Sequence, residues 1–396
     1  MEIPLFPPAT PADWRAAVEW HLKGAGVGSL ERETAGGIVR GPLFTRTDLP
    51  EALAPLSSDA PPGARESFPW RLLAPVRDPD LAFANGQLLD DLRGGASGLR
   101  ICAGEGEVPV TTRADLRRLL EGVHAEFIAI SFSPNARSEA LAGMVGDMPE
   151  LAGAKIRLGL DPACHARPNL PPQMKPFTLA CRKVHEAGGT EVDELAALAV
   201  TLAEAFRRHP DAHELSIIEI AADQDAHLGI AKLRAARRIA RRIADAFGAG
   251  DAVFEFHAIT SLRMMQAKDP WTNMLRVMNA GFGAVVGGAD AVLTRPFTDG
   301  YGRAMPFAHR IARNMQLLML EESHLGQVRD AAFGSYWHET VTDRIARAAW
   351  ARFQELEAAG GVSALPDSYT SAPGKPTVGV ELHPMPADVP MPKVRA

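Results

Sequence analysis

The sequence has few cysteines, and nothing in their spacing suggests a structural role. Cys102, Cys164 and Cys181 are the only three among 396 residues, and they lie far apart. Because no Cys-x-x-Cys pair occurs, the sequence predicts neither a zinc cage nor a disulfide framework, and we expect no bound metal. Cys181 follows an apolar run and is expected to be a small core residue.

Other absences narrow the class of protein. No run of about 18 apolar residues is present, so no membrane segment is expected. The first residues, MEIPLFPPATPADW, lack the basic start and apolar stretch of a secretory signal, which favours a cytoplasmic location. The net charge is −6 and no basic domain stands out, so nucleic acid is not an expected partner.

Short apolar runs alternate with helical patterns from about residue 98 onward. Seven strands are predicted, at residues 98–104, 125–132, 154–160, 176–183, 214–221, 252–259 and 289–294. Such nearly continuous apolar runs are typical of parallel strands that are covered on both faces. Helical patterns separate them, as after Thr190, where Leu195, Leu198 and Leu202 share one face. The order predicts an α/β fold of the (β/α)8 TIM-barrel type.

A doubly wound open sheet is the alternative fold, but no Gly-x-Gly-x-x-Gly follows the first predicted strand. We expect three parts in the chain. Residues 1–95, rich in Pro and Gly and with one helix from Pro11 to His21, are expected to form an N-terminal arm, which the family resemblance described below assigns to subunit contact. Residues 96–361 would form the barrel, and the Pro-rich residues 362–396 an extended tail.

Polar residues gather where the predicted strands end, which is the active face of a TIM barrel. The candidate ligand-binding residues are Arg182, Lys183, His257, Thr260, Ser261 and Arg295. Several cations at one barrel mouth could hold a phosphate or a carboxylate. Each candidate also has a purely structural explanation: His257 could be a hydrogen-bonded core histidine, and Arg182 and Lys183 could pair with loop carboxylates.

A cluster of arginines follows the fifth predicted strand. Arg234, Arg237, Arg238, Arg241 and Arg242 recur along one helical pattern. Their spacing predicts a basic helix face that lies in solvent or at an interface.

Several longer segments resemble the methylmalonyl-CoA mutase family. These are HAITSLRMMQAKDPWTNMLR (257–276), RIARNMQLLMLEES (310–323) and DAAFGSYWHE (330–339). The N-terminal FPPATPADWRAAVEWHLKG (6–24) is similar to the small, non-catalytic subunit of heterodimeric members. DQDAHLG (223–229) superficially resembles a cobalt-ligand loop, but its glycine stands one residue too early and it lies at a helix start, so no cobalt ligand is expected there.

The resemblance implies a TIM barrel with an N-terminal arm. In the family, coenzyme A threads the barrel axis, adenosylcobalamin caps the barrel, and a radical moves a thioester group between adjacent carbons. The chain would therefore belong to an isomerase complex that converts methylmalonyl-CoA to succinyl-CoA. Acyl-CoA is a candidate ligand, and the partner would be a homologous catalytic subunit.

The chain departs from the active members at positions that handle the substrate. Their Tyr-His at the end of the fourth strand aligns with Arg182 and Lys183, so Lys183 occupies a degenerate catalytic position. Their Gln aligns with Ile259, and their Thr-Asn with Arg295 and Pro296. No cobalamin domain is expected within residues 362–396, so adenosylcobalamin would be held by the partner.

The resemblance therefore favours a non-catalytic small subunit. Two alternatives stay open. One is a catalytic barrel subunit that uses a separate cobalamin-binding polypeptide, and the other is a free-standing acyl-CoA-binding barrel.

Overall fold

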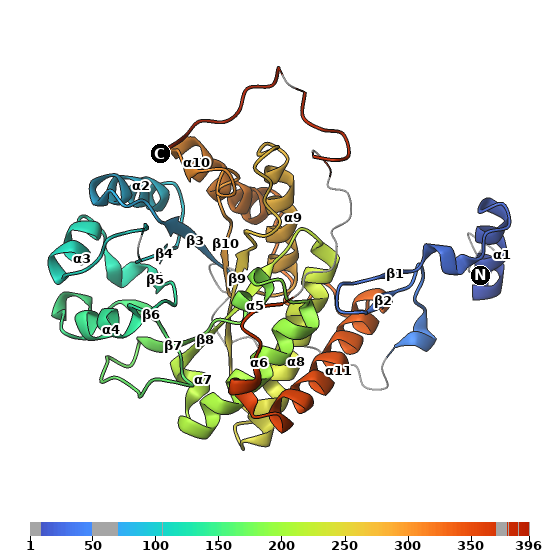
Figure 1. Ribbon diagram of the computed structural model, residues 1–396, viewed down its shortest axis with the longest axis horizontal. Coiled ribbons are helices and arrows are strands. Elements are labelled where there is room, and N and C mark those ends of the chain that lie inside the picture. The colour runs from blue at the N-terminus through green and yellow to red at the C-terminus, as the bar shows by residue number, and fades with distance from the viewer. Residues whose placement is uncertain are drawn as a thin grey trace, which may run out of the picture.

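The centre of the molecule is a closed barrel of eight parallel strands, in the order β10-β3-β4-β5-β6-β7-β8-β9 (Figure 1). The computed structural model describes residues 9–49, 70–104, 106–369, 378, 380–386 and 388–395. The strands are β3 (Arg71–Val76), β4 (Gly98–Ile101), β5 (Ala129–Phe132), β6 (Lys155–Leu160), β7 (Lys175–Leu179), β8 (Ser216–Ala222), β9 (Glu255–Thr260) and β10 (Ala291–Leu293). Closure of the ring confirms the predicted TIM barrel and excludes the open sheet.

Helices surround the barrel and cover the outer faces of its strands. They are α2 (Leu81–Arg93), α3 (Arg113–Leu119), α4 (Ser138–Gly146), α5 (Arg182–Glu186), α6 (Glu191–Arg208), α7 (Ala212–Leu215), α8 (Ala226–Ala246), α9 (Asn273–Val286), α10 (Pro306–Leu317) and α11 (Tyr336–Ala358). Helix α6 begins as predicted, because Thr190 and Asp193 form a reciprocal capping box. None of the helices in the described ranges is long and apolar enough to cross a membrane.

The first barrel strand lies within the segment that was expected to be an arm. Strand β3 pairs with β10 on one side and β4 on the other, so the barrel begins at Arg71 and not at residue 96. The sequence RLLAPV contains Pro75, and a proline counts against a central strand because it cannot donate to the ladder. Pro75 is nevertheless accommodated in this parallel pairing, opposite Arg100.

Helix α8 carries the arginines that were predicted to lie in solvent or at an interface, and two of them are buried. Arg234 is only 1% exposed and Arg237 only 8%. Arg234 pairs with Asp330 at 3.0 Å and with Glu339 at 2.5 Å, and Arg237 pairs with Asp290 at 2.9 Å. The prediction is wrong for these two residues because acidic partners come from segments far away in the sequence, which a local helical pattern cannot reveal.

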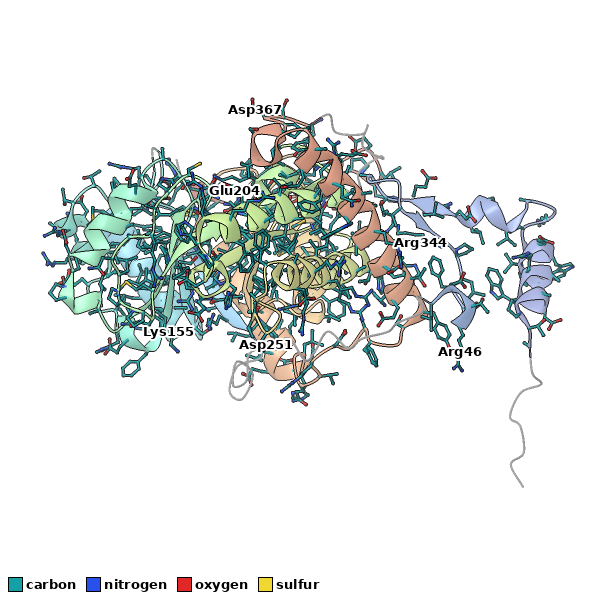
Figure 2. The ribbon with its side chains drawn as sticks, turned by 90° about the horizontal axis from the view of Figure 1, so that it is seen from below. Arg46, Lys155, Glu204, Asp251, Arg344 and Asp367 are labelled. Carbon is teal, nitrogen blue, oxygen red and sulfur yellow. The ribbon has the colours of Figure 1, made fainter. Side chains whose placement is uncertain are left out.

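The N-terminal arm has a part that packs on the barrel and a part that does not. Strands β1 (Arg32–Glu33) and β2 (Val39–Arg40) form a two-stranded sheet beside α11, and Arg344 donates to the carbonyl of Val39 at 2.8 Å. Helix α1 (Pro11–His21), whose predicted bounds are confirmed, projects away from the barrel in both views (Figures 1 and 2). No residue of α1 is buried, and the side chain of Trp20 is 77% exposed.

The described part of the tail returns to the barrel. Strand β12 (Val394–Arg395) pairs antiparallel with β11 (Arg303–Ala304), and Arg395 forms an ion pair with Asp78 at 2.9 Å. The indole nitrogen of Trp271 donates to the carbonyl of Pro390 at 2.9 Å. Beyond this short strand, the described residues of 378–395 contain no helix, as the Pro-rich composition predicts.

The buried arginine of α8 yields a stability prediction. We expect Arg234→Met to lower the free energy of unfolding by about 3–5 kcal/mol, because it leaves the buried carboxylates of Asp330 and Glu339 short of a cation. The matched control is Arg242→Met on the same helix, where the guanidinium lies over the Trp350 ring and is exposed. That change should cost less than about 1 kcal/mol. Reversible urea unfolding measures both, and equal losses would contradict the assignment.

Candidate functional site at the barrel axis and mouth

An ion pair crosses the interior of the barrel near its C-terminal end. Arg100 stands on β4 and Glu219 on β8, and these strands lie on opposite sides of the ring. Arg100 Nη1 lies 2.5 Å from Glu219 Oε1, and the two side chains are 2% and 0% exposed. A contact between opposite strands can only run through the axis, so these side chains fill the channel at this level.

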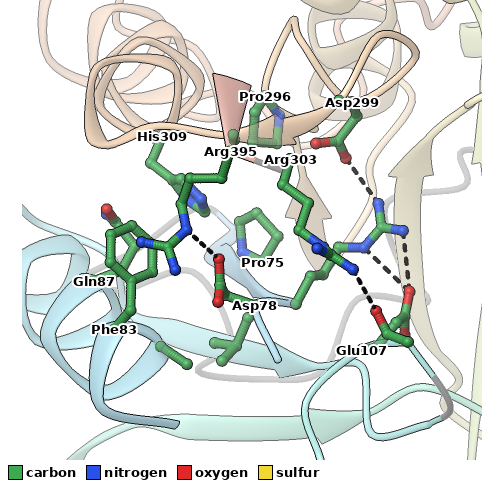
Figure 3. A pocket seen from close by; sticks show the side chains of 16 residues that line it. Pro75, Asp78, Phe83, Gln87, Glu107, Pro296, Asp299, Arg303, His309 and Arg395 are labelled. Carbon is green, nitrogen blue, oxygen red and sulfur yellow. Dashed lines mark hydrogen bonds and ion pairs between the residues drawn. The ribbon is translucent and has the colours of Figure 1, made fainter. Parts of the chain in front are cut away.

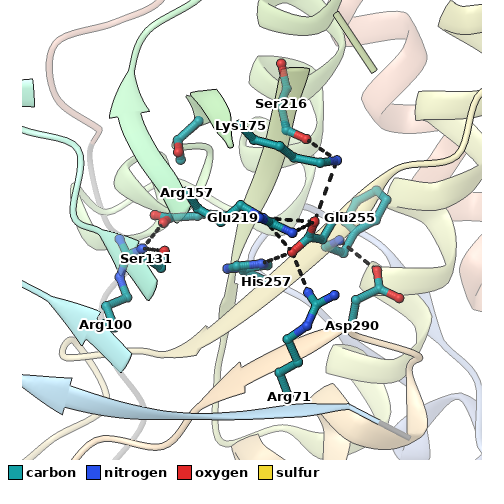
Figure 4. Close-up of polar contacts among 12 residues, drawn as sticks. Arg71, Arg100, Ser131, Arg157, Lys175, Ser216, Glu219, Glu255, His257 and Asp290 are labelled. Carbon is teal, nitrogen blue, oxygen red and sulfur yellow. Dashed lines mark hydrogen bonds and ion pairs between the residues drawn. The ribbon is translucent and has the colours of Figure 1, made fainter. Parts of the chain in front are cut away.

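A second cluster fills the axis nearer the N-terminal end (Figure 4). Its centre is Glu255, the first residue of β9. Glu255 pairs with Arg157 at 3.0 Å, with Arg71 at 2.6 Å and with Lys175 at 3.6 Å, and Nε2 of His257 lies 2.8 Å from its Oε1. The partners come from four strands, β6, β3, β7 and β9, so this cluster also spans the interior.

The buried carboxylates are ionised despite their surroundings. Burial alone would raise the pKa of Glu219, but the guanidinium groups of Arg100 and Arg182 outweigh it and lower that pKa. Burial would likewise raise the pKa of Glu255, yet Arg157 and His257 hold it well below its usual range. Each carboxylate is thus a charge whose burial is tolerated only because cations surround it.

A cavity of about 240 Å³ opens above the upper ion pair, at the C-terminal ends of the strands. Four arginines line it: Arg77, Arg100, Arg182 and Arg295. Glu107, Cys102 and Ile259 also contribute to its wall. The cavity is therefore the barrel mouth, and its chemistry is dominated by guanidinium groups.

The arginines are held in place by carboxylates and backbone carbonyls. Arg182 Nε donates to Glu219 Oε2 at 2.9 Å, and Arg77 pairs with Glu107 and with Asp299, each at 3.0 Å. Arg295 Nε donates to the carbonyl of Thr260 at 2.8 Å. These bonds fix the orientation of each guanidinium before any ligand arrives.

A larger cavity of about 450 Å³ adjoins the mouth and shares Pro75, Arg77 and Glu107 with it. Figure 3 shows Arg395 reaching into it from the tail, where its guanidinium lies 3.7 Å from the centroid of the Phe83 ring. The Arg77–Glu107 pair stands at the boundary between the two cavities.

Two of the six predicted ligand-binding residues, Arg182 and Arg295, do line the mouth. Lys183 is next to Arg182 but is exposed and is not part of the cavity wall. Although the residue as a whole is exposed, partial desolvation of its amine and the neighbouring Arg182 lower the pKa of Lys183. The predicted strand 176–183 is shorter than expected, because β7 ends at Leu179 and α5 begins at Arg182.

The other three predicted residues are buried in the framework. His257 is 1% exposed and is hydrogen-bonded to Glu255 within the axis, so the structural explanation fits it. Thr260 accepts a hydrogen bond from the backbone N–H of Arg295 at 2.8 Å. The Ser261 hydroxyl lies 3.0 Å from Nε2 of His185. These side chains position the mouth without lining it.

Sequence reasoning missed Arg77, Arg100 and the axis clusters. A usable signal existed, because Arg100, Arg157, Glu219 and Glu255 each interrupt a run that was treated as continuously apolar. A charged residue inside a strand that is covered on both faces must find a partner across the barrel, since an unpaired buried charge is too costly.

The fold and the site define a TIM barrel with a charged, occluded axis and an arginine-rich mouth. A family model of methylmalonyl-CoA mutase matches residues 157–370. The chain therefore belongs to the methylmalonyl-CoA mutase family.

Similar proteins carry the name of one subunit. The chain is 34% identical over 401 residues to the methylmalonyl-CoA mutase small subunit of Streptomyces virginiae, covering 90% of this chain and 65% of that protein. It is 36% identical to a probable small subunit of Mycobacterium bovis, over 84% of this chain and 60% of that protein. The small subunit of Propionibacterium freudenreichii subsp. shermanii is 30% identical, over 90% of this chain and 63% of that protein. The chain thus spans less than two thirds of these relatives.

The family generally uses adenosylcobalamin, and two features of the described residues bear on such a cofactor. The axis below the mouth is filled by the side chains of Arg100 and Glu219. The one segment with a likeness to a cobalt-ligand loop is engaged otherwise, because Asp225 caps α8 and Nδ1 of His227 lies 3.1 Å from Nε2 of His338.

The buried imidazole beneath the mouth should make stability depend on pH. Burial, together with Lys232 and Arg263, lowers the pKa of His185 to about 2, so the native state keeps this imidazole neutral. The unfolded imidazole titrates near 6.5, so protons favour unfolding as the pH falls below that value. From pH 6 to pH 5 this single group should remove stability at a rate approaching about 1.4 kcal/mol per pH unit.

The comparison is between the wild type and His185→Gln, measured by urea unfolding at each pH. We expect the variant to show the shallower loss of stability, because it lacks the titrating imidazole. His124→Gln, at an imidazole that is 79% exposed, serves as the control and should keep the wild-type slope. Parallel slopes for wild type and His185→Gln would show that His185 is not held neutral.

Proposed function

We propose that the chain is a non-catalytic barrel subunit of an adenosylcobalamin-dependent methylmalonyl-CoA mutase in the cytoplasm. Its partner would be a homologous, larger catalytic subunit that holds the cofactor and converts methylmalonyl-CoA to succinyl-CoA. The observation that carries this proposal is the ion pair between Arg100 and Glu219, which crosses the axis where the family places coenzyme A.

The lower axis cluster supports the same conclusion. A coenzyme A chain in the axis would have to displace Arg157 and Glu255, which are 6% and 10% exposed and paired at 3.0 Å. Breaking a buried pair costs about 3–5 kcal/mol, and two such layers lie in series. The binding of a flexible chain would have to compensate for both, so the barrel is poorly suited to hold the substrate.

The residues at the degenerate positions point in the same direction. Lys183, in place of the family histidine, lies outside the mouth cavity, while Arg182 is bound to Glu219. Ile259, in place of the family glutamine, is 2% exposed and has no hydrogen-bonding group in its side chain. Arg182 keeps guanidinium donors at the mouth but is held on Glu219, so none of these positions supplies the imidazole that the active members use. This disfavours a catalytic barrel that uses a separate cobalamin-binding polypeptide.

The arm supports a role in assembly. Trp14 and Val18 are half-buried and Trp20 is exposed, so α1 presents an apolar surface that the described residues do not cover. Exposed apolar surface of this kind is typical of a protein–protein contact. The base of the arm is fixed by the contacts of Arg40 with Asp225 and of Thr34 with Glu191, so α1 extends from an anchored segment of the arm.

The proposal is tested by assaying turnover of methylmalonyl-CoA with added adenosylcobalamin. The chain alone should show none, and Lys183→His should not restore it, because the axis stays closed. Mixed with the catalytic mutase subunit of the same cell, the chain should form a one-to-one complex whose activity or thermal stability exceeds that of the subunit alone. Turnover by this chain with only a small cobalamin-binding protein added would contradict the proposal.

The arm predicts how that complex is held together. Trp20→Ser should weaken binding to the catalytic subunit about tenfold or more, because an exposed tryptophan that becomes buried is a typical interface hot spot. Phe127→Ser is the matched control, since Phe127 is 81% exposed but lies before β5 of the barrel. Surface plasmon resonance with the immobilised catalytic subunit compares the two variants. Equal affinities would exclude α1 as a contact.

A further inference from the structure

We propose that the barrel mouth is a binding site for a small oxyanion, a carboxylate or a phosphate, held by Arg100, Arg182 and Arg295. This goes beyond the accessory role, because it gives the occluded barrel a ligand of its own. That the ligand is small rests on the closed axis described under the proposed function.

The charge of the site favours an anion. Four guanidinium groups line the cavity, and three carboxylates pair with them: Glu107, Glu219 and Asp299. The described residues therefore leave one positive charge in excess at the mouth. Because walls of low polarisability strengthen electrostatic attraction, such an excess raises the local concentration of anions.

One buried donor in the site is unsatisfied. Arg100 is 1% exposed, and its Nη2 has no hydrogen-bond partner among the described residues. Its Nη1 donates to the Ser131 hydroxyl at 3.0 Å and lies 2.5 Å from Glu219 Oε1, an ion-pair contact in which that oxygen accepts no hydrogen bond. Buried guanidinium N–H groups are normally hydrogen-bonded, and a buried N–H group without a partner costs free energy. An oxygen atom of a bound anion would complete the set.

The guanidinium groups are pre-positioned for the ligand. Glu219 holds Arg100 through Oε1 and Arg182 through Oε2, so both cations are fixed on one buried carboxylate. Arg295 is fixed from another strand by the carbonyl of Thr260. Planar guanidinium groups that are already oriented suit the two oxygens of a carboxylate or the several oxygens of a phosphate.

The volume limits the size of the ligand. The cavity of about 240 Å³ is smaller than the roughly 300–1,000 Å³ of ordinary cofactor and drug-sized sites. It suits an anion of a few non-hydrogen atoms. The Arg77–Glu107 pair lines both this cavity and the larger neighbouring one, so a longer ligand that extended in that direction would meet this pair.

The test titrates the full chain with inorganic phosphate and, separately, with malonate, by calorimetry at constant ionic strength with chloride as the background anion. A second readout is alkylation of cysteine followed by peptide mass spectrometry. Cys102 is half-buried and lines the cavity, whereas Cys164 is exposed elsewhere and serves as an internal reference. We expect saturable binding of at least one of the two anions, and slower alkylation of Cys102 but not of Cys164 when it is bound.

Variants connect the binding to the mouth. Arg182→Gln and Arg295→Gln should each raise the dissociation constant of the anion by about tenfold or more, which is the loss expected for one charge-assisted contact. Arg117→Gln removes the same charge from the exposed outer face of α3, where Arg117 pairs with Glu150, and should leave the affinity unchanged. Two mouth variants and the wild-type protection of Cys102 keep the test decisive if one variant fails to fold.

The outcomes separate this inference from the proposed function. Absence of saturable binding, or an equal loss in Arg117→Gln, would overturn the oxyanion site and leave the accessory role intact. If coenzyme A competed with the anion and protected Cys102 as well, a short-anion site would be excluded and the closed axis would itself be in doubt. Anion binding without competition by coenzyme A is the result that the oxyanion site requires, and it agrees with the closed axis of the proposed function.

Discussion

The ion pair between Arg100 and Glu219 is the interaction on which the rest of the site depends. It joins opposite sides of the barrel and closes the axis at the C-terminal end. The same carboxylate orients Arg182, so the pair also forms the floor of the mouth. Removing Glu219 would leave the buried guanidinium groups of Arg100 and Arg182 without their shared carboxylate, which is far more costly than losing a surface pair.

The interior of the barrel is charged while its outer core is apolar. A TIM barrel is normally filled by layers of side chains, and here two of the layers are charged clusters around Glu219 and Glu255. The strands and the surrounding helices depend on the outer core and on capping residues such as Thr190. The fold is therefore compatible with an interior that is filled by ion pairs.

Much of the fold was predictable from local patterns, whereas the site was only partly so. Seven of the eight strands, and helices such as α1 and α6, follow from periodicity and capping. Strand β3 was missed because it lies within residues 1–95, whose Pro and Gly content predicted an arm, and it contains Pro75 itself. The mouth was located through Arg182 and Arg295, but Arg100 and the burial of Arg234 depend on partners more than 95 residues away in the sequence, Glu219 and Asp330 among them. Such pairings follow from closure of the barrel and cannot be read from local spacing.

The most direct test of the account is the number of acyl-CoA molecules bound by the complex of this chain with a larger, homologous catalytic mutase subunit. Equilibrium dialysis with labelled acyl-CoA at saturation measures it. Because the axis of this chain is closed by Arg100 and Glu219, the account predicts one acyl-CoA for each pair of barrels. Two acyl-CoA molecules for each pair would show that this barrel opens to admit substrate, and would contradict the account.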